Sequence, residues 1–131
     1  WRKTYAFGLT LTGHDELEPG ASTNAERIEA MKKLHEAGSK TFASIEPIID
    51  FESSLDMIEK IVGFCDLYKI GLESGKKYND KELYEFITEV LILTRKAGKV
   101  YFKDSLLKAA GIDRSELYWY CVNRDYNLFN Q

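Results

Sequence analysis

The sequence is short of cysteine, and it has no long apolar run. No stretch approaches the roughly 20 apolar residues of a membrane-spanning helix, and no signal peptide is visible, so we expect no membrane association. Cys65 and Cys121 stand far apart without a neighbouring cysteine, which excludes a metal or cluster site built from cysteine alone. We therefore expect two reduced thiols and a cytoplasmic location.

The sequence also lacks an excess of positive charge. It has 18 Lys and Arg against 21 Asp and Glu, a net charge of −3. Dedicated nucleic-acid-binding proteins usually show a basic face, so nucleic acid is expected only as the substrate of a local site. What remains is ordinary for a globular protein: 131 residues, 44% apolar and 30% charged, enough for one domain with a real core.

Four short apolar segments alternate with four helical segments. The strands are expected at residues 5–12, 41–49, 66–73 and 100–103. The helices are expected at residues 24–37, 55–65, 80–97 and 106–110. This order predicts parallel strands with right-handed crossovers. The expected fold is therefore α/β, with four parallel strands alternating with helices in half of a TIM-type barrel.

Local signals set the boundaries of these elements. Thr23 and Glu26 form a capping box at the start of the first helix, and Asp80 is expected to cap the third. Pro47 cannot donate to a strand ladder, so the second strand is expected to end there. We divide the chain into residues 1–112, the (β/α) portion, and residues 113–131, an aromatic-rich helix or tail packed on it.

Polar side chains occur where each expected strand ends. Ser44 and Glu46 are two residues apart and share one face of a strand. A carboxylate is costly to bury unless it is paired or faces water, so Glu46 is expected to face a cavity. The other strands deliver Thr10 with Thr12, Glu73 with Ser74, and Lys103 with Asp104. Barrel sites lie at the carboxyl ends of strands, so these positions predict a shared site.

The residues alone leave the chemistry of this site open. Glu46, Glu73 and Lys103 could carry general acid/base catalysis, or they could bind hydroxyl, amino and carboxylate groups of a ligand. Arg27 lies in the first turn of a helix, where the dipole disfavours a cation, so it is either solvated or aimed at an anionic ligand. His14 lies in a loop and is expected to be solvated. No phosphate-binding loop, dinucleotide fingerprint, HExxH or nucleophile elbow is present.

Several short motifs together resemble the second half of a radical S-adenosylmethionine barrel, nearest to the spore photoproduct lyase-like group. They are residues 9–12 (LTLT), 17–21 (LEPGA), 26–28 (ERI), 34–38 (LHEAG) and 44–48 (SIEPI). Residues 71–75 (GLESG) and 102–104 (FKD) are also similar to a phage-associated branch of that superfamily. The resemblance covers about residues 5–110. It implies that S-adenosylmethionine is the cofactor. It also implies cofactor contacts for Thr10, Thr12, Arg27, Ser44 and Glu46, with Arg27 on the methionyl carboxylate, and substrate-side positions for Glu73 and Lys103.

The chain departs from this family in one respect. The CxxxCxxC motif that ligates the family's [4Fe–4S] cluster is absent. The chain is therefore expected to be either the carboxyl-terminal part of a larger enzyme or a degenerate relative; the cluster is expected only in a parent protein, and this chain alone is expected to be inactive. The expected partner is the missing amino-terminal half of the barrel or a second copy of the chain. Two alternatives stay open: a non-catalytic α/β binding domain, and an unrelated half-barrel enzyme that uses Glu46 and Glu73 as acid and base.

Overall fold

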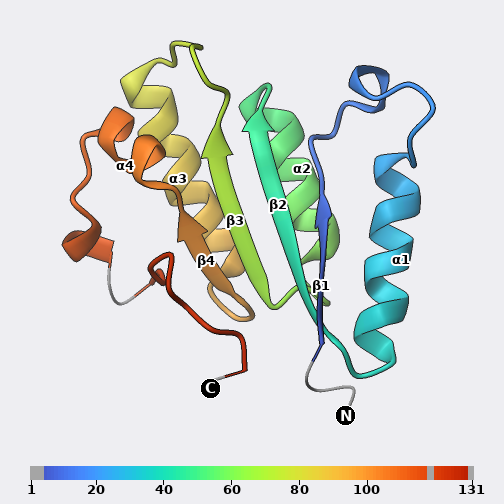
Figure 1. The fold of residues 1–131 in the computed structure, drawn as a ribbon. Helices are drawn as coiled ribbons and strands as arrows, with labels where there is room; N and C mark the ends of the chain where they lie inside the picture. Colours follow the sequence, from blue (N-terminus) through green and yellow to red (C-terminus); the bar gives the residue numbers. More distant parts are fainter. Residues whose placement is uncertain (1–4, 118–119, 130–131) are drawn as a thin grey trace.

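A computed structural model describes residues 5–117 and 120–129 (Figure 1). Its centre is one four-stranded parallel sheet in the order β1-β2-β3-β4. The strands are β1 (Ala6–Thr10), β2 (Lys40–Ile48), β3 (Leu67–Leu72) and β4 (Lys99–Phe102). The helices are α1 (Asn24–Glu36), α2 (Phe51–Ile61), α3 (Asp80–Thr94) and α4 (Asp104–Ala110), with 3-10 helices η2 (Asp15–Leu17) and η3 (Arg114–Leu117). The predicted α/β fold of four parallel strands alternating with helices is confirmed, as one open sheet.

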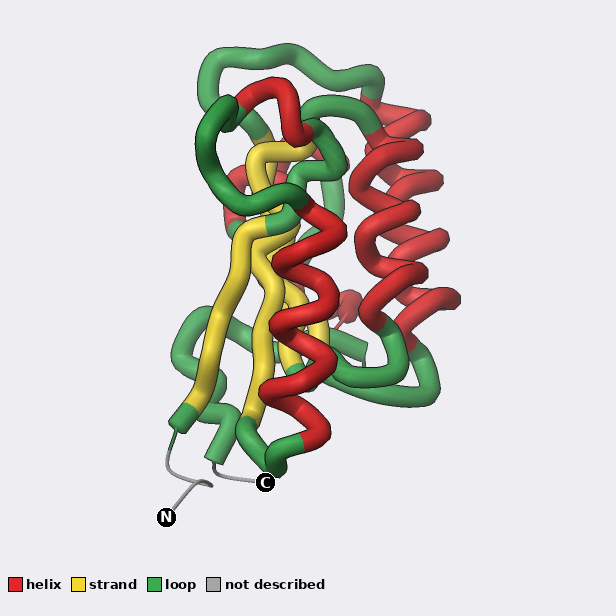
Figure 2. The backbone as a smooth tube through the Cα atoms, turned by 90° about the vertical axis from the view of Figure 1, so that its right-hand side faces the viewer, coloured by secondary structure: helices red, strands yellow, loops and turns green. Residues whose placement is uncertain are grey.

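The helices are distributed unevenly about the sheet. Figure 2 shows the sheet with helices packed on one face and no helical layer on the other. Each new strand is added on the same side of the previous strand, and all the crossovers have the same hand. The connecting helices therefore lie on one common face of the sheet. The core lies between these two layers and includes Leu11, Ala43, Ile45, Ile58, Tyr68, Ile70, Leu83, Phe86, Val100 and Phe102. We call the opposite side of the sheet the open face.

The helix ends follow their local sequence. The Thr23 hydroxyl accepts from the Glu26 amide and the Glu26 side chain accepts from Thr23, which confirms the predicted capping box of α1. The prediction for α3 was wrong by one residue, because the Asn79 side chain, not Asp80, accepts from the Glu82 amide and caps the helix. An amide and a carboxylate are both good caps, so the sequence did not separate the two neighbours.

The predicted end of β2 was also wrong. The strand continues past Pro47 to Ile48, although its register with β3 is irregular between Ile45 and Ile48. Pro47 lies at this irregularity, where the ladder does not need its amide. The carboxyl end of β2 therefore reaches further along the sheet than the sequence indicates.

The carboxyl-terminal segment is bound to β4 and to the lower part of the open face. Cys121 forms an isolated parallel bridge with Val100, and the Val122 amide donates to the Val100 carbonyl at 2.9 Å. In both ribbon views the segment then crosses the amino-terminal side of the open face (Figures 1 and 2). Leu67 on that face is 4% exposed. The predicted helix is limited to η3, and Tyr118 and Trp119 lie outside the described residues.

None of the described helices combines the length and the apolar character needed to cross a membrane.

Candidate functional site

The sheet register builds the candidate site from the open-face residues of all four strands. Thr10 pairs with Ser44, Ser44 with Lys69, and Lys69 with Tyr101. Because paired residues point to the same side of a sheet, these four side chains form one row across the open face. The strand alternation predicted from the sequence is thus observed, with the apolar face under the helices and the small or polar face open.

Glu46 and Lys103 form an ion pair at the carboxyl end of this face. Lys103 Nζ lies 2.6 Å from Glu46 Oε2, and the two side chains are 44% and 27% exposed. The pair sits over Gly71, where an added Cβ would lie 2.7 Å from Glu46 Oε2 and 2.9 Å from Lys103 Cδ. A glycine at this point of β3 therefore leaves the space that the two charged side chains occupy.

Lys69 lies beside the ring of Phe42 in the interior of the open face. Its Nζ is 4.6 Å from the ring centroid, a cation–π arrangement. The Phe42 ring in turn lies over Gly8, where a Cβ would come within 2.1 Å of Phe42 Cζ. The glycine of β1 thus lets an aromatic ring lie close to the sheet, and the ring supports the lysine.

Arg27 reaches from α1 to the carboxyl end of β1. Its Nη1 donates to the Thr10 carbonyl at 2.8 Å, and its Nη2 pairs with Glu18 Oε2 at 2.5 Å. The side chain is only 18% exposed, so of the two roles considered from the sequence, simple solvation is wrong. The guanidinium is instead held at the rim beside Thr10, and Glu18 occupies the position that an external carboxylate would take.

Thr12 belongs to the loop after β1, and its contacts are structural. Its amide donates to Asn24 Oδ1 at 3.2 Å, and its hydroxyl accepts from the His14 amide at 3.1 Å. The residue is 9% exposed. Thr12 therefore fixes the loop that carries Glu18 and His14, and Thr10 lies closer to the open face.

His14 is not the solvated side chain expected from the sequence. Its Nε2 contacts Asp50 Oδ2 at 2.5 Å and its Nδ1 contacts Glu16 Oε2 at 2.8 Å. Asp50 also caps α2 through the Ser53 amide. Hydrogen bonds to Glu16 and Asp50 raise the pKa of His14 above its usual value. The contact joins the β1–α1 loop to the start of α2, and sequence spacing of 36 residues gave no signal for it.

Glu73 lies beyond the end of β3 and is exposed. Its amide donates to the Tyr78 hydroxyl at 2.9 Å, and no ion pair joins its carboxylate to another described residue. The structure therefore brings Ser44, Glu46 and Lys103 to one face with Thr10, and leaves Glu73 apart from them.

Two residues of the open face were missed as candidates. Lys69 lies between Ser44 and Tyr101 in the cross-strand row. Arg114 lies with its Cζ 5.2 Å from the Tyr101 ring centroid and pairs with Asp104 at 2.7 Å. Lys69 could have been found from the alternation of β3, since it is two residues before Gly71 on the polar face. Arg114 comes from a distant segment and carried no such signal.

The thiols do not suit a cluster or metal site. Burial raises the pKa of Cys65 to about 12 and that of Cys121 to about 11. Cluster ligands are thiolates, and these thiols are held protonated at neutral pH. Within residues 5–117 and 120–129, no group of three or more His, Cys, Asp or Glu is placed to hold a metal ion.

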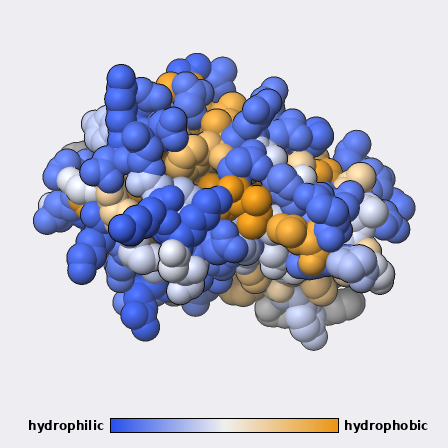
Figure 3. Space-filling model, turned by 90° about the horizontal axis from the view of Figure 1, so that it is seen from above, coloured by the Kyte–Doolittle hydropathy of each residue, from blue (hydrophilic) through white to orange (hydrophobic). Residues whose placement is uncertain are grey.

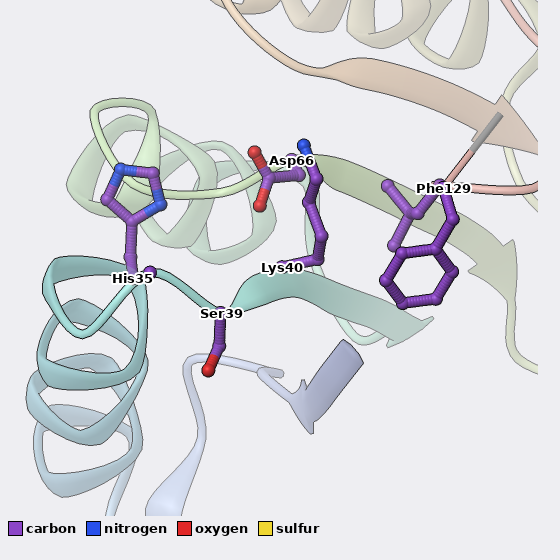
Figure 4. A pocket seen from close by; sticks show the side chains of 7 residues that line it. His35, Ser39, Lys40, Asp66 and Phe129 are labelled. Atoms are coloured by element: carbon purple, nitrogen blue, oxygen red, sulfur yellow. The ribbon is translucent and has the colours of Figure 1, made fainter. Parts of the chain in front are cut away.

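The cavities lie away from the Glu46–Lys103 pair. One of about 430 Å³ lies at the amino end of the strands, lined by His35, Gly38, Ser39, Lys40, Asp66, Leu128 and Phe129 (Figure 4). Another of about 250 Å³ adjoins the carboxyl end of β2, with Asp50, Lys76 and Tyr78 among its lining residues. Seen from the carboxyl ends of the strands, the surface is largely hydrophilic with apolar groups near its centre (Figure 3). Neither of these two cavities is lined by Glu46 or Lys103, so Glu46 does not face either of them as the predicted cavity.

Comparison with known proteins gives one similar sequence of undetermined function. An uncharacterized protein of Methanocaldococcus jannaschii is 28% identical over 108 residues, which cover 71% of this chain and 42% of that protein. The chain thus spans less than half the length of the curated relative it matches. No protein-family model matches the chain. No solved structure matches it either.

Proposed function

We propose that the open face is one half of the binding site of a radical S-adenosylmethionine enzyme, and that this chain supplies cofactor and substrate contacts from the carboxyl ends of its strands. One observation carries the proposal: the helices cover one face of the parallel sheet, and the other face presents Ser44, Glu46 and Lys103 toward the end where barrel enzymes bind ligands. The motifs at residues 9–12, 44–48, 71–75 and 102–104 lie at the carboxyl ends of these strands, and the other three lie in the β1–α1 loop and in or just after α1.

The residues fit a cofactor with hydroxyl, amino and carboxylate groups. Glu46 and Ser44 offer acceptors and a donor for ribose hydroxyls and an amino group. Arg27 is held at the Thr10 carbonyl by its Nη1, and a methionyl carboxylate could replace Glu18 on its Nη2. The Thr10 hydroxyl adjoins this position, whereas Thr12 is engaged in the loop.

The iron–sulfur cluster of such an enzyme would come from outside this chain. Cys65 and Cys121 are protonated and far apart in sequence, and the family's cluster motif is absent. The cluster supplies an electron for cleavage of the cofactor. The chain's own residues would bind and orient the cofactor and hold the substrate beside Lys103.

The two edges of the sheet indicate where the missing half would join. The β4 edge is bound by the chain itself through Val100, Cys121 and Val122. The outer edge of β1 has no neighbouring strand among the described residues, and Tyr5 and Phe7 beside it are 52% and 41% exposed. Unpaired edges invite strand addition. The partner, whether the amino-terminal half or a second copy, is therefore expected on β1.

Titration calorimetry with S-adenosylmethionine tests the proposal. We expect measurable binding, weakened about tenfold, or ~1.4 kcal/mol, by Arg27→Ala and by Glu46→Gln. Lys32→Ala is the matched control, because Lys32 is exposed on α1 away from the open face. Equal affinities in all four proteins would show that the cofactor, if bound, is elsewhere.

The parent gene gives a second, independent test. An in-frame CxxxCxxC upstream of this chain, and cofactor binding by the joined protein, are the expected results. A folded chain without affinity for S-adenosylmethionine and a gene without the motif would together overturn the proposal in favour of a non-catalytic α/β binding domain. An acid/base pair of Glu46 and Glu73 is less well supported, because Glu46 is paired with Lys103 and Glu73 stands apart.

A further inference from the structure

The open face carries one more positive side chain than its carboxylates can pair with. Two carboxylates adjoin this face, and each has a cation of its own: Glu46 pairs with Lys103 at 2.6 Å, and Asp104 pairs with Arg114 at 2.7 Å. Lys69 forms no ion pair with any residue in the described part of the chain, and its ammonium lies over the Phe42 ring. One ammonium group is therefore left on this face without a carboxylate.

The surroundings of Lys69 favour the binding of an oxyanion to its ammonium group over hydration alone. Lys69 is half-buried, and the Phe42 ring holds its stem across the sheet, so part of the side-chain entropy that a ligand contact would cost is already lost. A cation–π contact at such a site contributes only about 0.5–1 kcal/mol, which leaves the ammonium free to bind an anion as well. Its three N–H donors have no carboxylate acceptor in this structure.

Two residues with hydroxyl groups lie in the same cross-strand row as Lys69. Ser44 is the direct cross-strand partner of Lys69, and Thr10 is the direct partner of Ser44, so both hydroxyls lie on the open face in the same row. A lysine with neighbouring hydroxyl donors is a common arrangement for binding phosphate or carboxylate oxygens. Glu46 lies one pair further along β2, and its charge is already neutralised by Lys103.

We propose that Lys69, with the hydroxyls of Ser44 and Thr10, forms an oxyanion site on the open face that takes a phosphate or carboxylate group of a ligand. The site shares Ser44 and Thr10 with the proposed cofactor site, but its cation is Lys69 and not Lys103 or Arg27. It does not depend on S-adenosylmethionine, since any ligand bound across the strands with such a group would use it. Because the face is open, the isolated chain is expected to bind a simple oxyanion weakly.

An NMR titration of the full chain tests this site. Uniformly ¹⁵N-labelled protein is titrated with inorganic phosphate and, separately, with acetate, each against sodium chloride at the same ionic strength. We expect saturable shifts of the Ser44, Lys69 and Tyr101 amides with an oxyanion and not with chloride. The comparison of phosphate with acetate distinguishes a phosphate site from a carboxylate site.

Matched lysine variants locate the anion. Lys69→Met keeps the apolar stem and removes the charge, and it should weaken binding at least about fivefold, whereas Lys32→Met should leave it unchanged. Ser44→Ala, a smaller change that retains the lysine, should weaken binding about twofold to threefold. The proposal is overturned if Lys69→Met binds as the unaltered chain does, if chloride gives the same shifts, or if binding is lost in Lys103→Met instead.

This test separates the oxyanion site from the proposed function. Arg27→Ala and Glu46→Gln report on S-adenosylmethionine and leave Lys69 in place, and the phosphate titration contains no cofactor. Phosphate binding without cofactor binding would therefore support the oxyanion site and count against the cofactor proposal, and the reverse result would do the opposite.

Discussion

Neighbouring residues of β3 belong to two different environments. Tyr68 and Ile70 are completely buried under the helices. Lys69 lies between them in the sequence and Gly71 follows Ile70, and both lie on the open face, Lys69 beside Phe42 and Gly71 beneath the Glu46–Lys103 pair. The same strand therefore contributes apolar packing on one face and lies under charged side chains on the other. A polar residue within an apolar strand thus indicates which face of the sheet is available to a ligand. Its apolar neighbours lie on the face whose packing determines the free energy of unfolding.

Paired alanine substitutions in β3 give the largest expected difference. Ile70→Ala should lower the free energy of unfolding by about 2–5 kcal/mol, because it leaves a cavity in the core. Lys69→Ala, one residue earlier, should change it by less than about 1 kcal/mol. Urea unfolding followed by circular dichroism measures both. Similar losses in the two variants would show that the open face is packed against something that covers it.

A substitution at Gly8 tests whether packing on the open face also contributes to stability. Gly8→Ala should destabilise the chain by about 1–3 kcal/mol, because the new Cβ meets the Phe42 ring and an overpacked site must shift. Gly63→Ala is the control, since no atom lies within 4 Å of an added Cβ there. Thermal unfolding measures both variants. Equal unfolding temperatures would mean that the Phe42 ring moves away from β1 at no cost in free energy.

The loop contact of His14 should depend on pH. Hydrogen bonds to Glu16 and Asp50 raise its pKa in the folded chain, so its contribution is full below the unfolded value of 6.5 and is lost as the pH rises through the raised value. His14→Asn should therefore cost up to about 1 kcal/mol near pH 5.5 and little near pH 9. Denaturant unfolding at both pH values measures the difference, and a larger loss at high pH would contradict it.

Gly71→Ala should have the smallest effect on stability. The atoms that an added Cβ meets belong to the flexible ends of Glu46 and Lys103, so we expect a change within about 0.5 kcal/mol and a broken ion pair. The Lys103 Nζ resonance in ¹⁵N NMR should lose its dependence on Glu46→Gln in the Gly71→Ala background. A retained dependence would mean that the pair adapts to the larger residue.

The fold was predictable because it rests on local periodicity. Period-two alternation located β1 to β4, and the repeated pattern of helix end, Ala-Gly, lysine and strand at residues 34–42 and 93–101 matches the starts of β2 and β4, with Gly38 and Gly98 both at positive φ. The errors at Asn79 and at Pro47 were made where neighbouring residues compete for one role or where the ladder is irregular. The second helix was predicted at residues 55–65 and is observed at Phe51–Ile61, because the Asp50 side chain caps it through the Ser53 amide.

The site was predictable only in outline. The rim position of Ser44, Glu46 and Lys103 follows from strand ends, but the pairing of Glu46 with Lys103 needs the sheet order, which no local pattern specifies. The engagement of Arg27 by Glu18 and of His14 by Asp50 depends on the path of a loop. Lys69 was passed over because it lies in the middle of a strand and not at its end, although the open face makes that middle accessible.

The agreement between strand order and chain order has a consequence for synthesis. Since β1, β2, β3 and β4 lie side by side in the order in which they are translated, each new strand emerges next to a partner that is already available. The outer edge of β4 is paired by Cys121 and Val122, which are translated after β4 itself. The outer edge of β4 therefore stays unpaired, and available to chaperones, until Cys121 and Val122 have been synthesised.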